Sequence, residues 1–159
     1  MRKPPPYTLR TAQAADYAMV GAWITDPEVC RRWGGPQLAY PFRCEELPDL
    51  LKATKENTFC LLDPARHLTG FGQILSRAPG TVHLMRIIVD PAARGHGVGQ
   101  TLCQLLMAQA LRMLGPDRFT LRVYPDNVPA LRTYQRLGFI TIDADPETGV
   151  LLMQKCLDR

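Results

Sequence analysis

The stretch that decides the fold runs from residue 87 to residue 99 and reads IIVDPAARGHGVG. Its apolar beginning resembles the end of a buried strand, and Gly95, Gly97 and Gly99 lead into an apolar-periodic segment. Glycines at a strand-to-helix junction permit positive φ angles, and the N-terminus of a helix offers unpaired N–H groups and a partial positive charge. The stretch therefore predicts a strand, an anion-binding loop and a helix in succession.

The spacing of these glycines argues against a dinucleotide-binding loop. The G-x-G-x-x-G pattern would require a glycine at position 100, where Gln100 stands. The loop also follows three strand-like runs, over residues 58–62, 68–76 and 81–89, separated by turn residues. A Rossmann unit would open the chain with this loop instead. An antiparallel meander before the loop is the favoured interpretation, and dinucleotide binding is the weaker alternative.

The remaining segments alternate between helix and strand signals. Asp26-Pro27 is a typical helix start, and Gly115-Pro116 ends the long helix that follows the glycines. We expect one α/β domain over residues 1–159, of mixed α+β order, with a mainly antiparallel central sheet of about six to seven strands flanked by helices. The further expected strands cover residues 7–11, 119–124, 139–142 and 150–156, and the further expected helices cover residues 14–24, 27–33, 44–56 and 128–137.

Composition narrows the class of protein. The 159 residues are 46% hydrophobic and 21% charged, which is ordinary globular usage. No apolar run is long enough for a membrane span, and the basic start lacks a signal-peptide core, so we expect a cytoplasmic protein without membrane contact. The net charge of +4 suits an anionic ligand or mere solubility, and the absence of a basic run argues against nucleic acid. Five widely spaced cysteines predict reduced thiols, with neither disulfides nor a metal site.

Two motifs carry a resemblance to a known family. Arg94-x-x-Gly97-x-Gly99 resembles the R/Q-x-x-G-x-G/A pyrophosphate loop of the GNAT superfamily of acetyl-CoA-dependent N-acetyltransferases. Downstream, the stretch from Asn127 to Phe139, with Tyr134 inside it, is similar to that family's N-x-x-A-x-x-x-Y-x-x-x-G-F/Y motif. The resemblance covers about residues 81–143. It implies the GNAT acyl-CoA N-acyltransferase fold and acetyl transfer from acetyl-CoA to a primary amine, with no metal.

The resemblance also implies which residues hold acetyl-CoA. The strand before the loop would contact the pantetheine arm through its backbone, as a peptide adds to a strand edge. Loop N–H groups would hold the pyrophosphate, and Asn127 would reach the pantetheine arm. His96 lies inside this loop, and we expect a solvent-facing residue beside phosphate and not a catalyst. The expected cofactor-binding residues are Ile87, Ile88, Val89, Arg94, Gly95, His96, Gly97, Val98, Gly99, Asn127 and Tyr134.

Two residues are candidates for catalysis. Tyr134 matches the position that, in many family members, protonates the departing thiolate, although packing between helix and sheet is the alternative. The glutamates that serve as bases in two branches of the family are replaced by Arg122 and His83. Arginine cannot accept a proton, whereas the ordinary pKa of histidine suits a general base. His83 is therefore the candidate base, with a half-buried structural histidine and a water route as alternatives.

The acceptor is not identified by the sequence beyond a small-molecule or peptide amine. Trp33, Tyr40 and Phe42 lie where the family's early helices wall the acceptor site, and they could clasp an aliphatic chain or a cation. A loop pinned in the core explains them equally well. A non-catalytic acyl-CoA-binding or regulatory module is the rival function. Both a monomer and a homodimer are compatible with the sequence.

Overall fold

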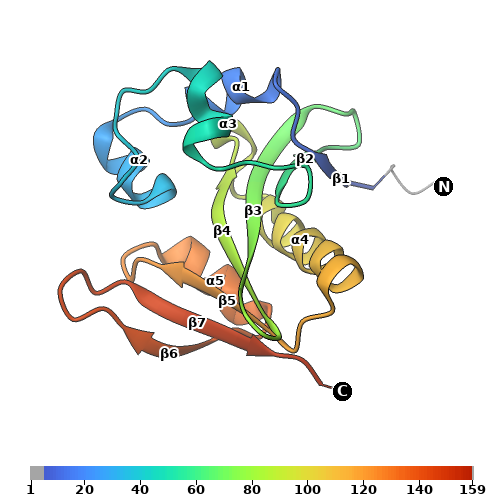
Figure 1. The fold of residues 1–159 in the computed structure, drawn as a ribbon, viewed down its shortest axis with the longest axis vertical. Helices are drawn as coiled ribbons and strands as arrows, with labels where there is room; N and C mark the ends of the chain where they lie inside the picture. The colour runs from blue at the N-terminus through green and yellow to red at the C-terminus, as the bar shows by residue number, and fades with distance from the viewer. Residues whose placement is uncertain (1–5, 159) are drawn as a thin grey trace.

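The computed structural model, which describes residues 6–158, contains a twisted seven-stranded sheet (Figure 1). The strand order is β1-β2-β3-β4-β5-β7-β6, and all neighbours are antiparallel except the parallel pair β4 and β5. The expected meander is confirmed as β2, β3 and β4. The strands are β1 Thr8–Thr11, β2 Thr58–Leu62, β3 Leu68–Ala78, β4 Thr81–Val89, β5 Arg118–Val123, β6 Ile140–Ala144 and β7 Leu151–Cys156.

The helices lie on both faces of the sheet (Figure 1). Helices α1 (Asp16–Ala22), α2 (Pro27–Gly34) and α3 (Leu47–Leu50) share one apolar core with Phe71 and Ile88. The long α4 (Val98–Leu114) and α5 (Val128–Arg136) pack on the opposite face. Within residues 6–158, none of the helices has the length and apolar character needed to span a bilayer.

The predicted glycine loop has the expected conformation. Gly95 and Gly97 have φ angles of 84° and 76°, and a short 3-10 helix, η2 (Pro91–Ala93), precedes them. Helix α4 begins directly after Gly97 and is capped at its other end by Gly115, which has a φ of 54°. Both helix ends thus lie where the sequence placed them, because only glycine adopts these left-handed conformations without a steric penalty.

One expected helix is much shorter than the sequence suggested. Residues 44–56 form a 3-10 turn, η1 (Cys44–Glu46), followed by the single turn of α3. Lys52 then takes a φ of 52°, and the Asn57 side chain accepts a hydrogen bond from the Thr54 N–H at 2.7 Å. This local turn competes with further helical hydrogen bonds. Leu47 and Leu51 are buried, whereas Leu50 is 46% exposed, and the helix ends before a second turn.

Strands β4 and β5 separate where the sheet changes direction. Their pairing joins only Thr81, Val82 and His83 to residues 118–120. Further along, Met85 pairs with Gln73 and Ile88 with Phe71, so β4 has a bulge of one extra residue, and Arg86 within it has a φ of 50°. Bulges bend a strand and increase its twist. The opening between β4 and β5 therefore begins beside the bulge, and it positions the site.

Candidate active site

A cleft of about 690 Å³ lies between the end of β4, the glycine loop and α5. Ten of the eleven residues expected to bind acetyl-CoA line this cofactor cleft. The exception is His96, which is exposed and lies outside the lining. The ten lining residues are Ile87, Ile88, Val89, Arg94, Gly95, Gly97, Val98, Gly99, Asn127 and Tyr134.

The N-terminus of α4 faces the cofactor cleft through Val98, Gly99 and Gln100. No side chain caps this end of the helix, so its first N–H groups remain available to a ligand. A Cβ atom added to Gly95 or Gly97 would meet nothing within 4 Å, so any larger side chain would occupy the open space of the loop. The loop therefore combines free donors, a helix dipole and room for an anion.

The charges of the cofactor cleft are of one sign. Arg94, Arg132 and Arg136 belong to its lining, which includes no aspartate or glutamate. Such a lining suits an anionic ligand such as a polyphosphate, and the volume of about 690 Å³ lies in the usual range of small-molecule and cofactor sites. Arg132 and Arg136 were not among the residues predicted from the sequence. Their spacing of four residues on a helix, centred on Tyr134, was the signal that placed them on one face.

Tyr134 belongs to the linings of two neighbouring cavities. It lines the cofactor cleft and also an inter-strand cavity of about 110 Å³ between β4 and β5. Its side chain is 8% exposed and packs edge-on against Phe139, with ring centroids 6.2 Å apart. Burial, assisted by the neighbouring Cys103 thiol, raises the pKa of Tyr134 above its ordinary value. The phenol is therefore protonated at neutral pH and can donate a proton or a hydrogen bond.

The inter-strand cavity shares Ile87, Asn127, Ala130 and Tyr134 with the cofactor cleft. Trp33 also lines it, and this tryptophan is 8% exposed. Tyr40 and Phe42 do not reach this cavity or the cofactor cleft. Their rings meet edge to face at 6.1 Å and pack against the core under α1, α2 and α3. Of the three aromatic candidates for the acceptor site, only Trp33 thus lines the inter-strand cavity.

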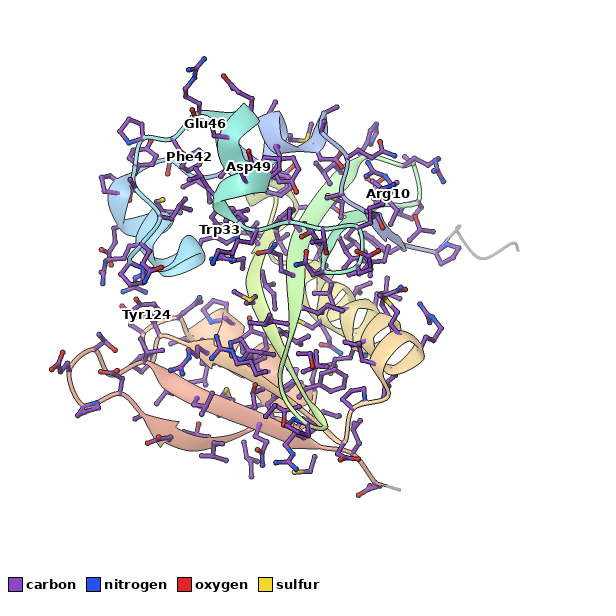
Figure 2. The ribbon with its side chains drawn as sticks, in the orientation of Figure 1. Arg10, Trp33, Phe42, Glu46, Asp49 and Tyr124 are labelled. Carbon is purple, nitrogen blue, oxygen red and sulfur yellow. The ribbon has the colours of Figure 1, made fainter. Side chains whose placement is uncertain are left out.

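An ion pair closes one rim of the inter-strand cavity. The Arg32 guanidinium of α2 donates two hydrogen bonds of 2.7 Å to Asp126, in the loop between β5 and α5. It also lies 4.4 Å from the ring centroid of Tyr124 and bonds Glu28. Figure 2 shows Trp33 and Tyr124 on the two sides of this boundary between α2 and the later strands. This contact could not be predicted from local sequence patterns, because it joins residues 94 positions apart.

His83 lies on β4, beyond the linings of the cofactor cleft and the inter-strand cavity. It is 3% exposed, and its Nδ1 lies 2.8 Å from the Thr120 hydroxyl. Burial, with help from Arg77 and Arg122, lowers the pKa of His83 to about 4. The ring is therefore neutral at pH 7, as a base must be, but it is a weak acceptor of protons. Its role as general base stays a prediction.

Comparison with known proteins identifies the family and agrees with the fold. Residues 22–139 match the Acetyltransferase (GNAT) family, and the chain therefore belongs to this family. The predicted family and fold class are confirmed. Within residues 6–158, no group of three or more histidine, cysteine or acidic residues is placed to hold a metal ion.

Similar proteins include several acetyltransferases. The mycothiol acetyltransferase of Mycobacterium leprae is 37% identical over a region that covers 52% of this chain and 33% of that protein. This chain thus spans about a third of the length of that relative. An N-acetyltransferase 9-like protein of Nematostella vectensis is 26% identical over 76% of this chain and 67% of that protein.

Among solved structures, the spermidine N-acetyltransferase of Vibrio cholerae in complex with CoA and spermine has a TM-score of 0.78 at 19% identity, covering 94% of this chain and 95% of that one. A GCN5-related N-acetyltransferase of Kribbella flavida has a TM-score of 0.78 at 23% identity, covering 98% of this chain and 100% of that one. At these identities the two structures show that the fold is shared.

Proposed function

We propose that this protein transfers the acetyl group of acetyl-CoA to a primary amine by direct attack in a ternary complex. The observation that carries the proposal is the position of Tyr134 at the junction of the cofactor cleft and the inter-strand cavity. A proton donor is needed where the thioester sulfur and the attacking amine meet, and Tyr134 is a protonated phenol at the boundary of the two hollows. The relatives named as acetyltransferases support the same reaction class.

Each part of the site has a separate role in the proposed reaction. The loop from Arg94 to Gly99 binds the pyrophosphate, and the free edge of β4 beyond His83 aligns the pantetheine arm. The amine nitrogen attacks the thioester carbonyl, and a backbone N–H of Ile88 or Val89 stabilises the oxyanion. The C–S bond then breaks, the thiolate takes the Tyr134 proton, the amine gives up its own proton to water or to His83, and the tyrosinate regains a proton from water.

A thiol-release assay tests this function. Purified protein is incubated with acetyl-CoA and a panel of amines, namely amino acids, polyamines, aminoglycosides and short peptides, and free CoA thiol is measured. We expect release that depends on one class of amine, with an N-acetylated product in the mass spectrum. The rival, a non-catalytic acyl-CoA-binding module, predicts tight acetyl-CoA binding in calorimetry with no amine-dependent release. That pattern across the whole panel would overturn the proposed function.

A further inference from the structure

A third hollow, which we call the distal cavity, adjoins the inter-strand cavity on the side away from Tyr134. It has a volume of about 350 Å³ and lies between the loop after α2, the end of α3 and strands β3 and β4. Met85 and Arg86 line both cavities. Tyr134 therefore belongs to the walls of the cofactor cleft and the inter-strand cavity, and Arg86 belongs to the walls of the inter-strand cavity and the distal cavity.

Arg86 is a half-buried cation without an anionic partner among residues 6–158. Its Nη1 donates to the Gln73 side-chain oxygen at 2.8 Å, and its remaining contacts, to the carbonyls of Gly34 and Leu51, are long, at 3.4 to 3.5 Å. Carboxylates raise the pKa of Arg10, Arg31 and Arg32, whereas burial lowers that of Arg86. Since a guanidinium stays charged in proteins, Arg86 presents an uncompensated positive charge to the cavities.

The backbone is arranged to present this side chain. In a regular strand Arg86 would share a face with Val82 and Leu84, which are buried against α4. The bulge and the positive φ of Arg86 shift the register, so the guanidinium instead reaches Gly34 and Leu51 on the opposite face. A left-handed conformation at a non-glycine residue costs free energy, so surrounding contacts must hold Arg86 in it. Gln73, itself 2% exposed, holds the guanidinium in place.

The surrounding charges have the same sign. The linings of the inter-strand and distal cavities include Arg32, Lys52, Arg86 and Arg122 and no aspartate or glutamate. Arg32 is neutralised by Asp126 and Glu28, but Arg86 and Lys52 are not neutralised within either lining. Such a pair of hollows repels a polycation and attracts an anion.

Resting on the function proposed above, we propose that the acceptor is a small amine that also carries a carboxylate, and that Arg86 binds this carboxylate in the distal cavity. The amine would lie in the inter-strand cavity beside Tyr134, and the carboxylate would receive donors from the planar guanidinium fork, which suits two carboxylate oxygens. Lys52 at the rim adds a second positive charge. The acceptor class is therefore that of amino acids and related amino carboxylates, and polyamines are excluded.

The first experiment compares matched pairs of amines with the wild-type protein. A series of ω-amino acids from glycine to 6-aminohexanoate measures the distance between amine and carboxylate, and each acid is paired with its carboxamide. Spermidine is the polycation and 2-aminoethyl phosphate the alternative anion. We expect kcat/KM for the best acid to exceed that for its carboxamide by about tenfold to a hundredfold, the usual effect of hydrogen bonds to a charged group.

The second experiment changes Arg86 and a distant arginine. Arg86→Gln should lower kcat/KM for the best acid by about tenfold or more and that for its carboxamide by less than about threefold, so the preference for the acid disappears. Arg86→Lys keeps the charge and should retain part of the preference. Arg112→Gln, on the exposed face of α4, is the matched control and should leave the preference unchanged. Melting temperatures separate these effects from loss of fold, and the wild-type comparison stands even where Arg86→Gln is unstable.

The outcomes distinguish this inference from the proposed function. Equal kcat/KM for acids and carboxamides, or spermidine as the best substrate, would overturn the carboxylate site while leaving the acetyltransferase function intact. A preference for 2-aminoethyl phosphate over every amino acid would overturn the carboxylate assignment. If no amine is acetylated although acetyl-CoA binds, the proposed function fails, and the acceptor site fails with it.

Discussion

The indole Nε1 of Trp33 donates a hydrogen bond of 2.8 Å to the backbone carbonyl of Arg86. This bond ties the last turn of α2 to the bulge of β4, at the point where β4 leaves β5. The same tryptophan packs against Phe71 with ring centroids 5.8 Å apart. The Trp33 side chain therefore anchors the bulge through this hydrogen bond and also lines the inter-strand cavity.

Trp33→Phe should lower the free energy of unfolding by more than the loss of ring volume alone explains, because it also removes the hydrogen bond to the bulge. The phenyl ring keeps part of the packing but leaves the Arg86 carbonyl without its donor, which costs about 1 to 3 kcal/mol. Trp23→Phe is the matched control, because Trp23 is 7% exposed and donates no side-chain hydrogen bond within residues 6–158. Denaturant unfolding of both variants measures the difference. Equal losses of stability would show that the hydrogen bond contributes nothing beyond ring volume.

Features that depend on neighbouring residues could be predicted from the sequence, whereas the position of the Arg86 side chain could not. The glycine loop, the meander and both ends of α4 follow from turn residues and apolar spacing, so they could be placed in advance. Strand alternation puts Arg86 on the same face as Leu84, and nothing local reveals the bulge that moves it away. The Arg32 contact with Asp126 was likewise invisible, because it depends on how α2 and the loop after β5 come together.

Gly97→Val should abolish tight binding of acetyl-CoA while leaving most of the fold intact. A β-branched residue is strained at a φ of 76°, and its side chain would occupy the space in front of the α4 N-terminus. Calorimetry with acetyl-CoA measures the effect, and we expect a loss of affinity of about tenfold or more. Gly35→Val, at a φ of 92° but outside the cofactor cleft, controls for backbone strain. Unchanged affinity in Gly97→Val would remove the loop from the binding site.

His83 should make the protein less stable as the pH falls below neutrality. The folded pKa is lowered to about 4 by burial, while the unfolded value is near 6.5, so between these values only the unfolded chain binds the proton. The contribution of neutral His83 to the free energy of unfolding is therefore fully present above pH 6.5, and about 3 kcal/mol of it is lost by pH 4. Denaturant unfolding at pH 7 and pH 4.5 should show a smaller difference for His83→Gln. His67→Gln, whose side chain is 79% exposed, should behave as the wild type.

The same variant tests the catalytic prediction for His83. If the histidine accepts the proton of the amine, His83→Gln lowers turnover at neutral pH and recovers at high pH, where free amine is abundant. A water route predicts the same dependence of rate on pH in both proteins. The burial of His83 and its bond with Thr120 favour the water route, and the pH profile decides between them.

Tyr134→Phe deletes one hydroxyl and keeps the ring, so it separates chemistry from packing. As the proton donor to sulfur, the hydroxyl acts in the transition state, and its loss should lower kcat by about tenfold or more with little change in acetyl-CoA affinity. Because burial raises the pKa of Tyr134, the wild-type rate should show no loss of this acid up to at least pH 9. The edge-on contact with Phe139 survives in the variant, so the melting temperature should change little. Steady-state kinetics on the best amine, calorimetry with acetyl-CoA and thermal melts give the three readouts. Wild-type turnover with a lowered melting temperature would assign Tyr134 to packing, and the thiolate would then take its proton from water.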